Sequence, residues 1–230
     1  MARRPSLESA VSRINERGVL LVFPINNREL PLSLWSEFFP KKRMVWDWND
    51  DAAGEVSDMW GLMKRLSDCR QVVYSKWYQG RATFFSRDLF TAMLRVRCVP
   101  TDARRRLSPT ARQLFEVLEN NSPLSTRKLK ELTDLQGRLH EAEYSRAMKE
   151  LFTQFWIVGY GEVDDGAFPS LAVGATELLF DDLWRQAEDL QVRKAQAAID
   201  LWMPQSSHFR RFFDKTSLEF GHGKSAPKVV

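Results

Sequence analysis

The sequence predicts a mainly helical α+β fold with small β-hairpins, built from tandem winged-helix modules. Apolar residues recur at helical spacing in three consecutive segments and then at every second position, which indicates three helices followed by a hairpin. This order occurs twice, on either side of a linker from Cys98 to Leu107 that contains a proline and three consecutive arginines. We therefore expect an N-terminal winged-helix-like domain at 1–98, a winged helix-turn-helix domain with a long C-terminal helix at 99–203, and a C-terminal tail at 204–230.

The first copy begins with a helix at 7–17. Ser6 can cap its start, Gly18 can end it, and its apolar residues fall on one face. A short apolar run follows at 19–23. The further elements expected in this half are helices at 31–39 and 55–66, strands at 72–77 and 81–85, and a helix capped by Ser86.

The second copy begins at Ser108, where a capping serine precedes a proline at the first helical position. Asp164-Asp165-Gly166 is a strong turn signal for the hairpin of this half. The elements expected after Ser108 are a helix that ends near 121, a short helix capped by Ser125, a third helix at 141–155, strands at 157–163 and 168–173, and a long helix at 176–202.

Charge is distributed unevenly along the chain, although the formal net charge is only +4. Residues 95–150 carry 12 basic side chains against 8 acidic ones, whereas residues 160–200 carry 3 against 9. This asymmetry is typical of a protein with one nucleic-acid face.

Composition excludes several classes of function. The longest apolar run is only five residues, Val19 to Phe23, and residues 1–5 do not lead into a signal-peptide core, so we expect a soluble, cytoplasmic protein that does not associate with membranes. Two cysteines and three widely separated histidines provide neither a disulfide framework nor a spaced zinc site. We therefore expect no metal and no cofactor.

In a winged helix, the third helix can enter the major groove of DNA while the second helix and the hairpin contact flanking phosphates. We expect double-stranded DNA as the partner, because the amides and hydroxyls at a helix start suit phosphate oxygens. The alternative for each cation is the solvated side of an amphipathic helix. The candidate DNA-binding residues are Arg104, Arg105 and Arg106 in the linker, Ser125, Arg127, Lys128 and Lys130 in the second helix, Arg146 and Lys149 in the third helix, and Trp77 and Arg81 in the first hairpin.

Three other segments carry functional side chains. Trp77 could stack on an exposed base beside Arg81, or its ring could pack beneath the hairpin. The acidic residues of 46–51, with Glu55, could bind Mg²⁺. The favoured interpretation is a loop whose Asp or Asn caps the helix that begins near Glu55. The aromatic side chains of His208 to Phe213 would be unfavourable in water, so they must pack against the rest of the protein or bind a partner. We expect them to pack against the protein.

Several segments carry a resemblance to a known family. They are Leu124 to Leu129, Ala147 to Leu151 and Ile157 to Tyr160, within residues 105–180, and Arg17 to Asn26 near the N-terminus. Together they resemble the AlkZ/YcaQ-like crosslink-repair DNA glycosylases. The resemblance implies tandem winged helices and DNA binding.

The same resemblance argues against glycosylase activity. In that family the N-terminal segment carries a Gln, one apolar residue and then Gln or Asp, which are implicated in hydrolysis of the glycosidic bond. Leu21 and Phe23 stand at the matching positions. Neither side chain can polarise water or stabilise positive charge, so no catalytic residue is expected.

Two other functions stay open. The second module could serve a transcriptional regulator, which predicts a palindromic DNA site and a homodimer formed through the helix at 176–202. Alternatively, the winged helices could be a docking module for a protein partner that never touches DNA.

Overall fold

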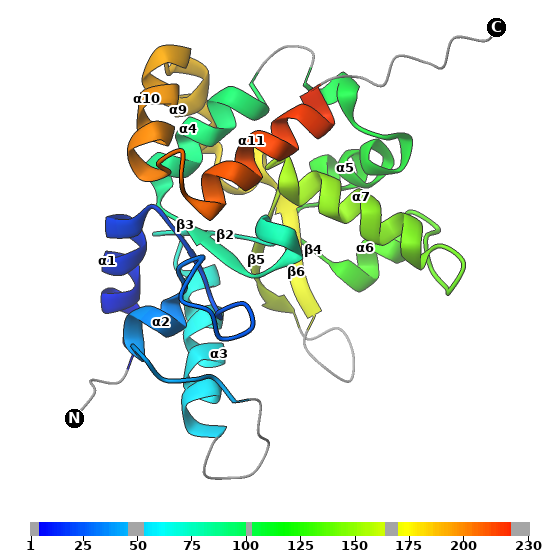
Figure 1. The fold of residues 1–230 in the computed structure, drawn as a ribbon. Coiled ribbons are helices and arrows are strands. Elements are labelled where there is room, and N and C mark those ends of the chain that lie inside the picture. The colour runs from blue at the N-terminus through cyan, green and yellow to red at the C-terminus, as the bar shows by residue number, and fades with distance from the viewer. Residues whose placement is uncertain (1–4, 46–52, 100–102, 164–169, 222–230) are drawn as a thin grey trace, which may run out of the picture.

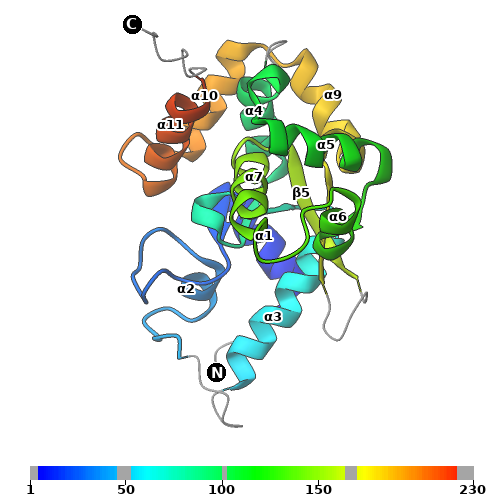
Figure 2. The same ribbon diagram turned by 90° about the vertical axis from the view of Figure 1, so that its right-hand side faces the viewer.

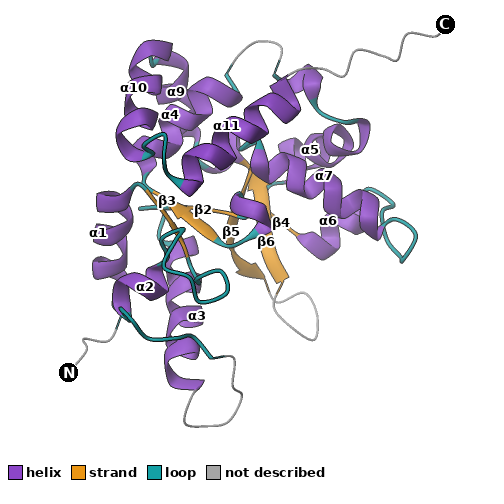
Figure 3. Ribbon diagram, viewed as in Figure 1, coloured by secondary structure: helices purple, strands orange, loops and turns teal. Residues whose placement is uncertain are grey.

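The structure, a computed structural model, describes residues 5–45, 53–99, 103–163 and 170–221. Helices surround a central antiparallel sheet (Figures 1 and 3), so the mixed α+β class that the sequence predicts is confirmed. The tandem winged-helix arrangement stays a prediction.

The strands of the described residues form one sheet in the order β1-β3-β2-β5-β6-β4. Both predicted hairpins are confirmed, because β2 pairs with β3 and β5 pairs with β6 in antiparallel register. The strands are β1 Val19–Leu21, β2 Val73–Ser75, β3 Thr83–Phe85, β4 Leu124–Ser125, β5 Ile157–Val163 and β6 Ser170–Ala175.

Serine caps begin several helices, as the sequence predicts. Ser6, Ser86, Ser108 and Ser125 each accept the backbone N–H of the residue three positions later, which satisfies a donor that the first helical turn leaves free. The described helices are α1 Leu7–Arg17, α2 Leu34–Phe38, α3 Ala53–Asp68, α4 Arg87–Arg97, α5 Pro109–Asn121, α6 Thr126–Leu132, α7 Glu141–Thr153, α8 Thr176–Leu179, α9 Asp181–Asp189, α10 Val192–Trp202 and α11 His208–Gly221.

The single long helix predicted at 176–202 is wrong. Phe180, with φ −132° and ψ 54°, and Leu190, with φ −74° and ψ 127°, leave the helical region and divide the segment into α8, α9 and α10. The bends let Leu183 and Ile199 on successive helices both reach the larger core, which one straight helix could not do. The transcriptional-regulator hypothesis expected a homodimer formed through one helix at 176–202, and the structure does not contain that helix.

Alternate residues of the sheet point into two different cores, as the pleat of a strand requires. Val19 and Phe85 belong to the larger core, which contains residues of α4, α5 and α7, whereas Leu20 and Phe84 belong to a smaller core with residues of α1, α2 and α3. The N-terminal half of the sheet is therefore covered on both faces.

The two halves of the chain meet at the pair Tyr74 and Gly159, where β2 adjoins β5. A Cβ atom at Gly159 would lie 2.1 Å from Cδ1 of the Tyr74 ring, so the close approach depends on glycine. The sheet and the larger core both draw residues from either side of the expected boundary at 98. The division into domains stays a prediction.

The aromatic residues of α11 dock on the body of the protein, as expected. Phe209 and Phe213 are buried, and the ring centroids of Phe209 and Phe212 lie 6.2 and 5.1 Å from that of Trp77. This packing places α11 beside α7 rather than in solvent.

Candidate nucleic-acid interface

An open groove of about 640 Å³ lies between the outer face of α7, the 3₁₀ turn Tyr78–Gly80 and α11. α11 crosses close to one end of α7, which Figure 1 and the turned view in Figure 2 both show. The groove is therefore formed by a predicted DNA-binding helix and by a segment that the sequence assigns to the tail.

Basic side chains line this groove from both helices. Arg146 and Lys149 come from α7, Arg211 and Lys215 come from α11, and all of them are exposed. Within the part of the chain that the structure describes, Arg146, Lys149 and Arg211 form no ion pair, while Lys215 lies 3.7 Å from Glu219 on its own helix. We call these four cations the groove cations.

Local sequence explains why the groove cations point outward. On α7, Tyr144, Ala147 and Leu151 are buried at helical spacing, so Arg146 and Lys149 fall on the opposite face. On α11, Phe209 and Phe213 are buried four residues apart. Arg211 and Lys215 follow the same spacing on the solvent side.

Two carboxylates also border the groove, and one of them is already occupied. Glu150 is buried, and its two oxygens accept the backbone N–H of Ser108 at 2.9 Å and its hydroxyl at 2.6 Å. Glu219 is exposed beside Lys215. The groove thus carries a surplus of positive charge.

Arg81, from the first hairpin, adds to the positive charge near the groove. Burial raises the pKa of Tyr78, whose ring lines the groove, while Arg211 and Arg81 oppose that rise through their positive charge. Both arginines therefore lie near the phenol. Arg81 is exposed and follows the 3₁₀ turn directly.

The cations of the predicted second helix are largely paired with acids. Lys128 lies 3.0 Å from Glu131, and Lys130 lies 2.6 Å from Glu141 and 4.6 Å from the ring centroid of Tyr144. A paired cation must give up its carboxylate before it can gain a phosphate. α6 is therefore a weaker candidate surface than the groove.

Ser125 and Arg127 stand at the start of α6. The side chain of Ser125 is buried and its hydroxyl accepts the N–H of Lys128 at 2.9 Å, so it serves as a cap and does not face a ligand. Arg127 borders a shallow hollow beside Thr126.

The linker arginines differ in their surroundings. Arg104 binds the carboxylate of Glu119 and lies over the ring of Phe115, 5.3 Å from its centroid. Arg105 is exposed, and Arg106 borders a small pocket described below. All three arginines are exposed on one 3₁₀ turn, but Arg104 is already paired with an acid.

Trp77 is misplaced in the predicted interface. Its side chain is 0% exposed, and its ring lies within 5–6 Å of Phe85, Phe155 and Phe212. A ring in this position cannot stack on a base. The alternative, packing beneath the hairpin, is the arrangement observed.

Leu21 and Phe23, which stand where the resembling family carries polar groups, are apolar parts of the fold. Leu21 is fully buried in β1, and its N–H bonds to the carbonyl of Leu32 at 3.0 Å. The ring of Phe23 lies between Trp35 and Trp60, with centroids 6.4 and 5.9 Å away. A cavity of about 350 Å³ beside it is lined by Asn26, Asn27 and Arg81 among others.

The predicted acidic site cannot be located, because residues 46–51 lie outside the described residues, as does the hairpin turn at 164–166. Glu55 forms an ion pair with Lys42 at 2.7 Å. Over the described ranges, no cluster of three or more His, Cys, Asp or Glu side chains could hold a metal ion. None of the described helices combines the length and hydropathy needed to cross a bilayer.

Sequence reasoning missed Arg211 and Lys215 as members of a basic surface. Their signal was their spacing of four residues, opposite Phe209 and Phe213, which predicts an amphipathic helix with a cationic face. Nothing in the sequence indicated that this face would lie beside α7.

A family model described as AlkZ related matches residues 5–205 of the chain. The match covers α1 to α10 and ends before α11. Comparison with curated proteins and with solved structures gave no match.

Proposed function

Since the chain belongs to the AlkZ-related family, we propose that it is a cytoplasmic, double-stranded DNA-binding relative of the repair glycosylases, and that the groove cations hold a sugar-phosphate strand. Binding of this kind requires no cofactor.

The observation that carries this proposal is the convergence of unpaired cations from two helices. Arg146, Lys149 and Arg211 border one groove and form no ion pair with any described residue. Each cation that neutralises a phosphate releases condensed counterions from DNA, which favours binding at low salt. A cation that is already paired with a carboxylate contributes less to DNA binding, because that ion pair must first be broken.

The groove favours contact with a backbone rather than insertion into a major groove. α11 flanks the outer face of α7 and would meet a duplex before α7 could enter it. Phosphates look alike along a duplex, so we expect affinity with little dependence on base sequence.

We also propose that the segment around Leu21 and Phe23 does not hydrolyse glycosidic bonds. Both side chains are apolar, and neither can orient water or stabilise an oxocarbenium-like state. We expect no base release from alkylated or crosslinked duplex. Release above the uncatalysed rate would show that the catalytic group lies elsewhere in the chain.

The DNA-binding proposal is tested by a salt series of duplex binding, measured by fluorescence anisotropy. The double variant Arg146→Gln with Lys149→Gln should reduce the slope of log K against log salt concentration by about 2, because each phosphate contact contributes about 0.9.

A matched control removes the same charge elsewhere. Arg193→Gln with Lys194→Gln changes two exposed cations of α10 that do not line the groove, and its slope should equal that of the wild type. Equal slopes in all three proteins would place the DNA contact outside the groove. Failure of the wild type to bind duplex at low salt would favour the docking module.

A further inference from the structure

The groove between α7 and α11 carries aromatic surface as well as positive charge. Tyr78 and Phe212 line it together with the groove cations. Tyr78 is buried, whereas Phe212 is only half-buried. Phe212 therefore keeps accessible apolar surface in a positively charged groove.

Buried rings hold Phe212 in place. Its ring centroid lies 5.1 Å from that of Trp77, in an edge-on arrangement, and 4.8 Å from that of Tyr78. Trp77 is fully buried, and its ring centroid lies 6.0 Å from that of Phe155, which follows α7. A side chain that packing has already fixed loses little freedom when a ligand covers it. Phe212 is therefore suited to binding a flat ring by stacking.

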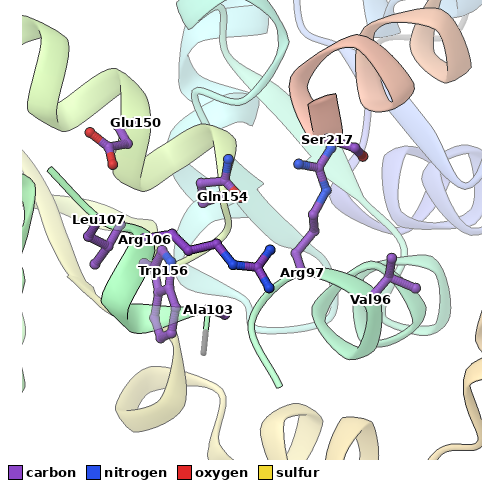
Figure 4. A pocket seen from close by; sticks show the side chains of 9 residues that line it. All are labelled: Val96, Arg97, Ala103, Arg106, Leu107, Glu150, Gln154, Trp156 and Ser217. Carbon is purple, nitrogen blue, oxygen red and sulfur yellow. The ribbon is translucent and has the colours of Figure 1, made fainter. Parts of the chain in front are cut away.

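Hydrogen bonds from α4 fix α11, which forms one wall of the groove. Arg97 lines a smaller pocket of about 120 Å³ between the end of α4, the turn of the linker arginines and α11. Figure 4 shows its side chain extending from α4 toward Ser217. The guanidinium donates to the carbonyl of Phe213 and to the hydroxyl of Thr216. The wall that carries Phe212 is therefore held by polar contacts as well as by aromatic packing.

A polar side chain also borders the groove. Gln79 is exposed and lines the groove from the 3₁₀ turn Tyr78–Gly80. Within the described ranges its side chain forms no hydrogen bond. A carboxamide can both donate to and accept from the polar edge of a nucleobase. The groove thus offers cations for phosphates, a ring for the face of a base and an amide for its edge.

We propose that the groove binds an unpaired stretch of DNA strand, with a nucleobase stacked on Phe212 and the flanking phosphates on the groove cations. This inference rests on the proposed DNA binding and concerns the form of DNA that the same groove prefers. In an intact duplex, neighbouring pairs cover the faces of each base, so Phe212 has nothing to stack on. An unpaired base exposes its face, and stacking on an aromatic side chain strengthens binding whatever the base.

The shape of the groove also favours a single strand. α11 flanks the outer face of α7 and would obstruct a duplex, whereas one strand can lie between the two helices. The groove volume of about 640 Å³ falls within the range of about 300–1,000 Å³ that is typical of ligand pockets. A nucleotide-sized group therefore fits.

The first test compares DNAs by fluorescence anisotropy at one salt concentration. Wild type should bind a duplex with a short gap in one strand about tenfold more tightly than the same duplex without the gap. A third DNA carries abasic nucleotides opposite the gap, which keeps the phosphates and the flexibility but removes the bases. The preference should disappear on this DNA, and a preference retained there overturns the proposal.

The second test changes the ring. Phe212→Leu keeps an apolar side chain without an aromatic face, and it should reduce the preference for gapped DNA to about twofold or less. Phe212→Tyr restores a ring and should restore the preference. Phe38→Leu is the control, because Phe38 of α2 is also half-buried but does not line the groove. An unchanged preference in folded Phe212→Leu overturns the proposal.

Failure of this preference and failure of DNA binding give different results. Equal affinity of wild type for gapped and intact duplex, with the salt dependence expected of the groove cations, overturns only the preference for an unpaired strand. If wild type binds neither DNA at low salt, both proposals are overturned. The abasic comparison needs only the wild type, so it decides the question even if Phe212→Leu does not fold.

Discussion

The indole of Trp77 lies where the first hairpin meets α11. It is fully buried and contacts aromatic rings from the sheet and from α11, such as Phe85 and Phe212. Burying so large a side chain contributes a sizeable part of the stability of a domain, and aromatic pairs add to it.

Trp77→Ala should therefore lower the free energy of unfolding by about 3–5 kcal/mol, as expected when a large aromatic side chain is removed from a core. Urea denaturation followed by far-UV circular dichroism measures this loss. Trp60→Ala is the control, because Trp60 is 46% exposed, and it should cost less than about 1 kcal/mol. Similar losses in both variants would contradict the burial of Trp77.

Glu177 at the start of α8 is a carboxyl in unfavourable surroundings. Burial raises its pKa, and the charge and hydrogen bond of Glu119 raise it further, while Arg104 opposes them. A carboxyl whose folded pKa is raised binds its proton more tightly when folded, so its ionisation costs stability as pH rises from the unfolded value of 4.5 through the folded pKa.

Glu177→Gln, which mimics the protonated acid, should raise Tm by about 2 °C at pH 8. The difference should vanish near pH 4, where Glu177 is protonated in both states. Melting curves between pH 4 and 8 check this, with Glu29→Gln, an exposed carboxylate that does not act on Glu177, as the control. A constant difference across that range would show that the gain does not come from proton binding.

At the scale of elements, α11 is held by charge as well as by aromatic packing. The side chain of Arg210 is 8% exposed and contacts Asp200 of α10 and Asp214 of its own helix. Hydrogen bonds from Arg210 and Gln196 lower the pKa of Asp200. The stability that these hydrogen bonds give to the folded state is fully present above the unfolded pKa of 3.8, and it is lost as the pH falls through the lower pKa of folded Asp200.

Arg210→Met should speed the exchange of the α11 amides about tenfold or more at pH 7, because it removes the charged hydrogen bonds that join α11 to Asp200 of α10. Hydrogen-exchange mass spectrometry resolves α11 from the sheet, whose exchange should not change. Arg185→Met serves as the control, since Arg185 is exposed and lies 3.4 Å from Asp181. Unchanged exchange in α11 would mean that aromatic packing alone holds the helix.

At the scale of the whole molecule, one sheet joins the two halves of the chain. Its junction is the pair Tyr74 and Gly159, and the ring of Tyr74 is 4% exposed, so it cannot swing away to admit a side chain. Because the sheet and the larger core continue across the junction, we expect one cooperative unfolding transition, with equal calorimetric and van't Hoff enthalpies.

Gly159→Val tests the junction. Its Cβ would overlap the Tyr74 ring, so Tm should fall by 10 °C or more, at about 2–4 °C per kcal/mol for a chain of this size. Gly61→Ala is the control, because Gly61 lies within α3 with open space around it, and alanine there should stabilise the helix by up to about 1 kcal/mol. Two separate transitions in the wild type would contradict the single sheet.

The local elements could be predicted from the amino-acid sequence, because the forces that define them act within a few residues. A serine caps the N–H three positions later, and a hairpin turn joins adjacent strands, so Ser6, Ser108, Ser125 and both hairpins follow from neighbouring residues. Helical spacing likewise predicted the outward faces of α7. The prediction of one helix at 176–202 was wrong because its bends serve packing against distant residues.

Which side chains can reach a ligand depends on the packing of the whole chain. That packing buried Trp77 under α11, paired Lys130 with Glu141, and brought Arg211 beside Arg146. It also joined the two halves in one sheet and gathered Arg97, Arg106 and Gln154 around one pocket. Burial and ion pairing depend on residues that are far apart in the chain. The order of residues in one segment therefore cannot show which other segment packs against it.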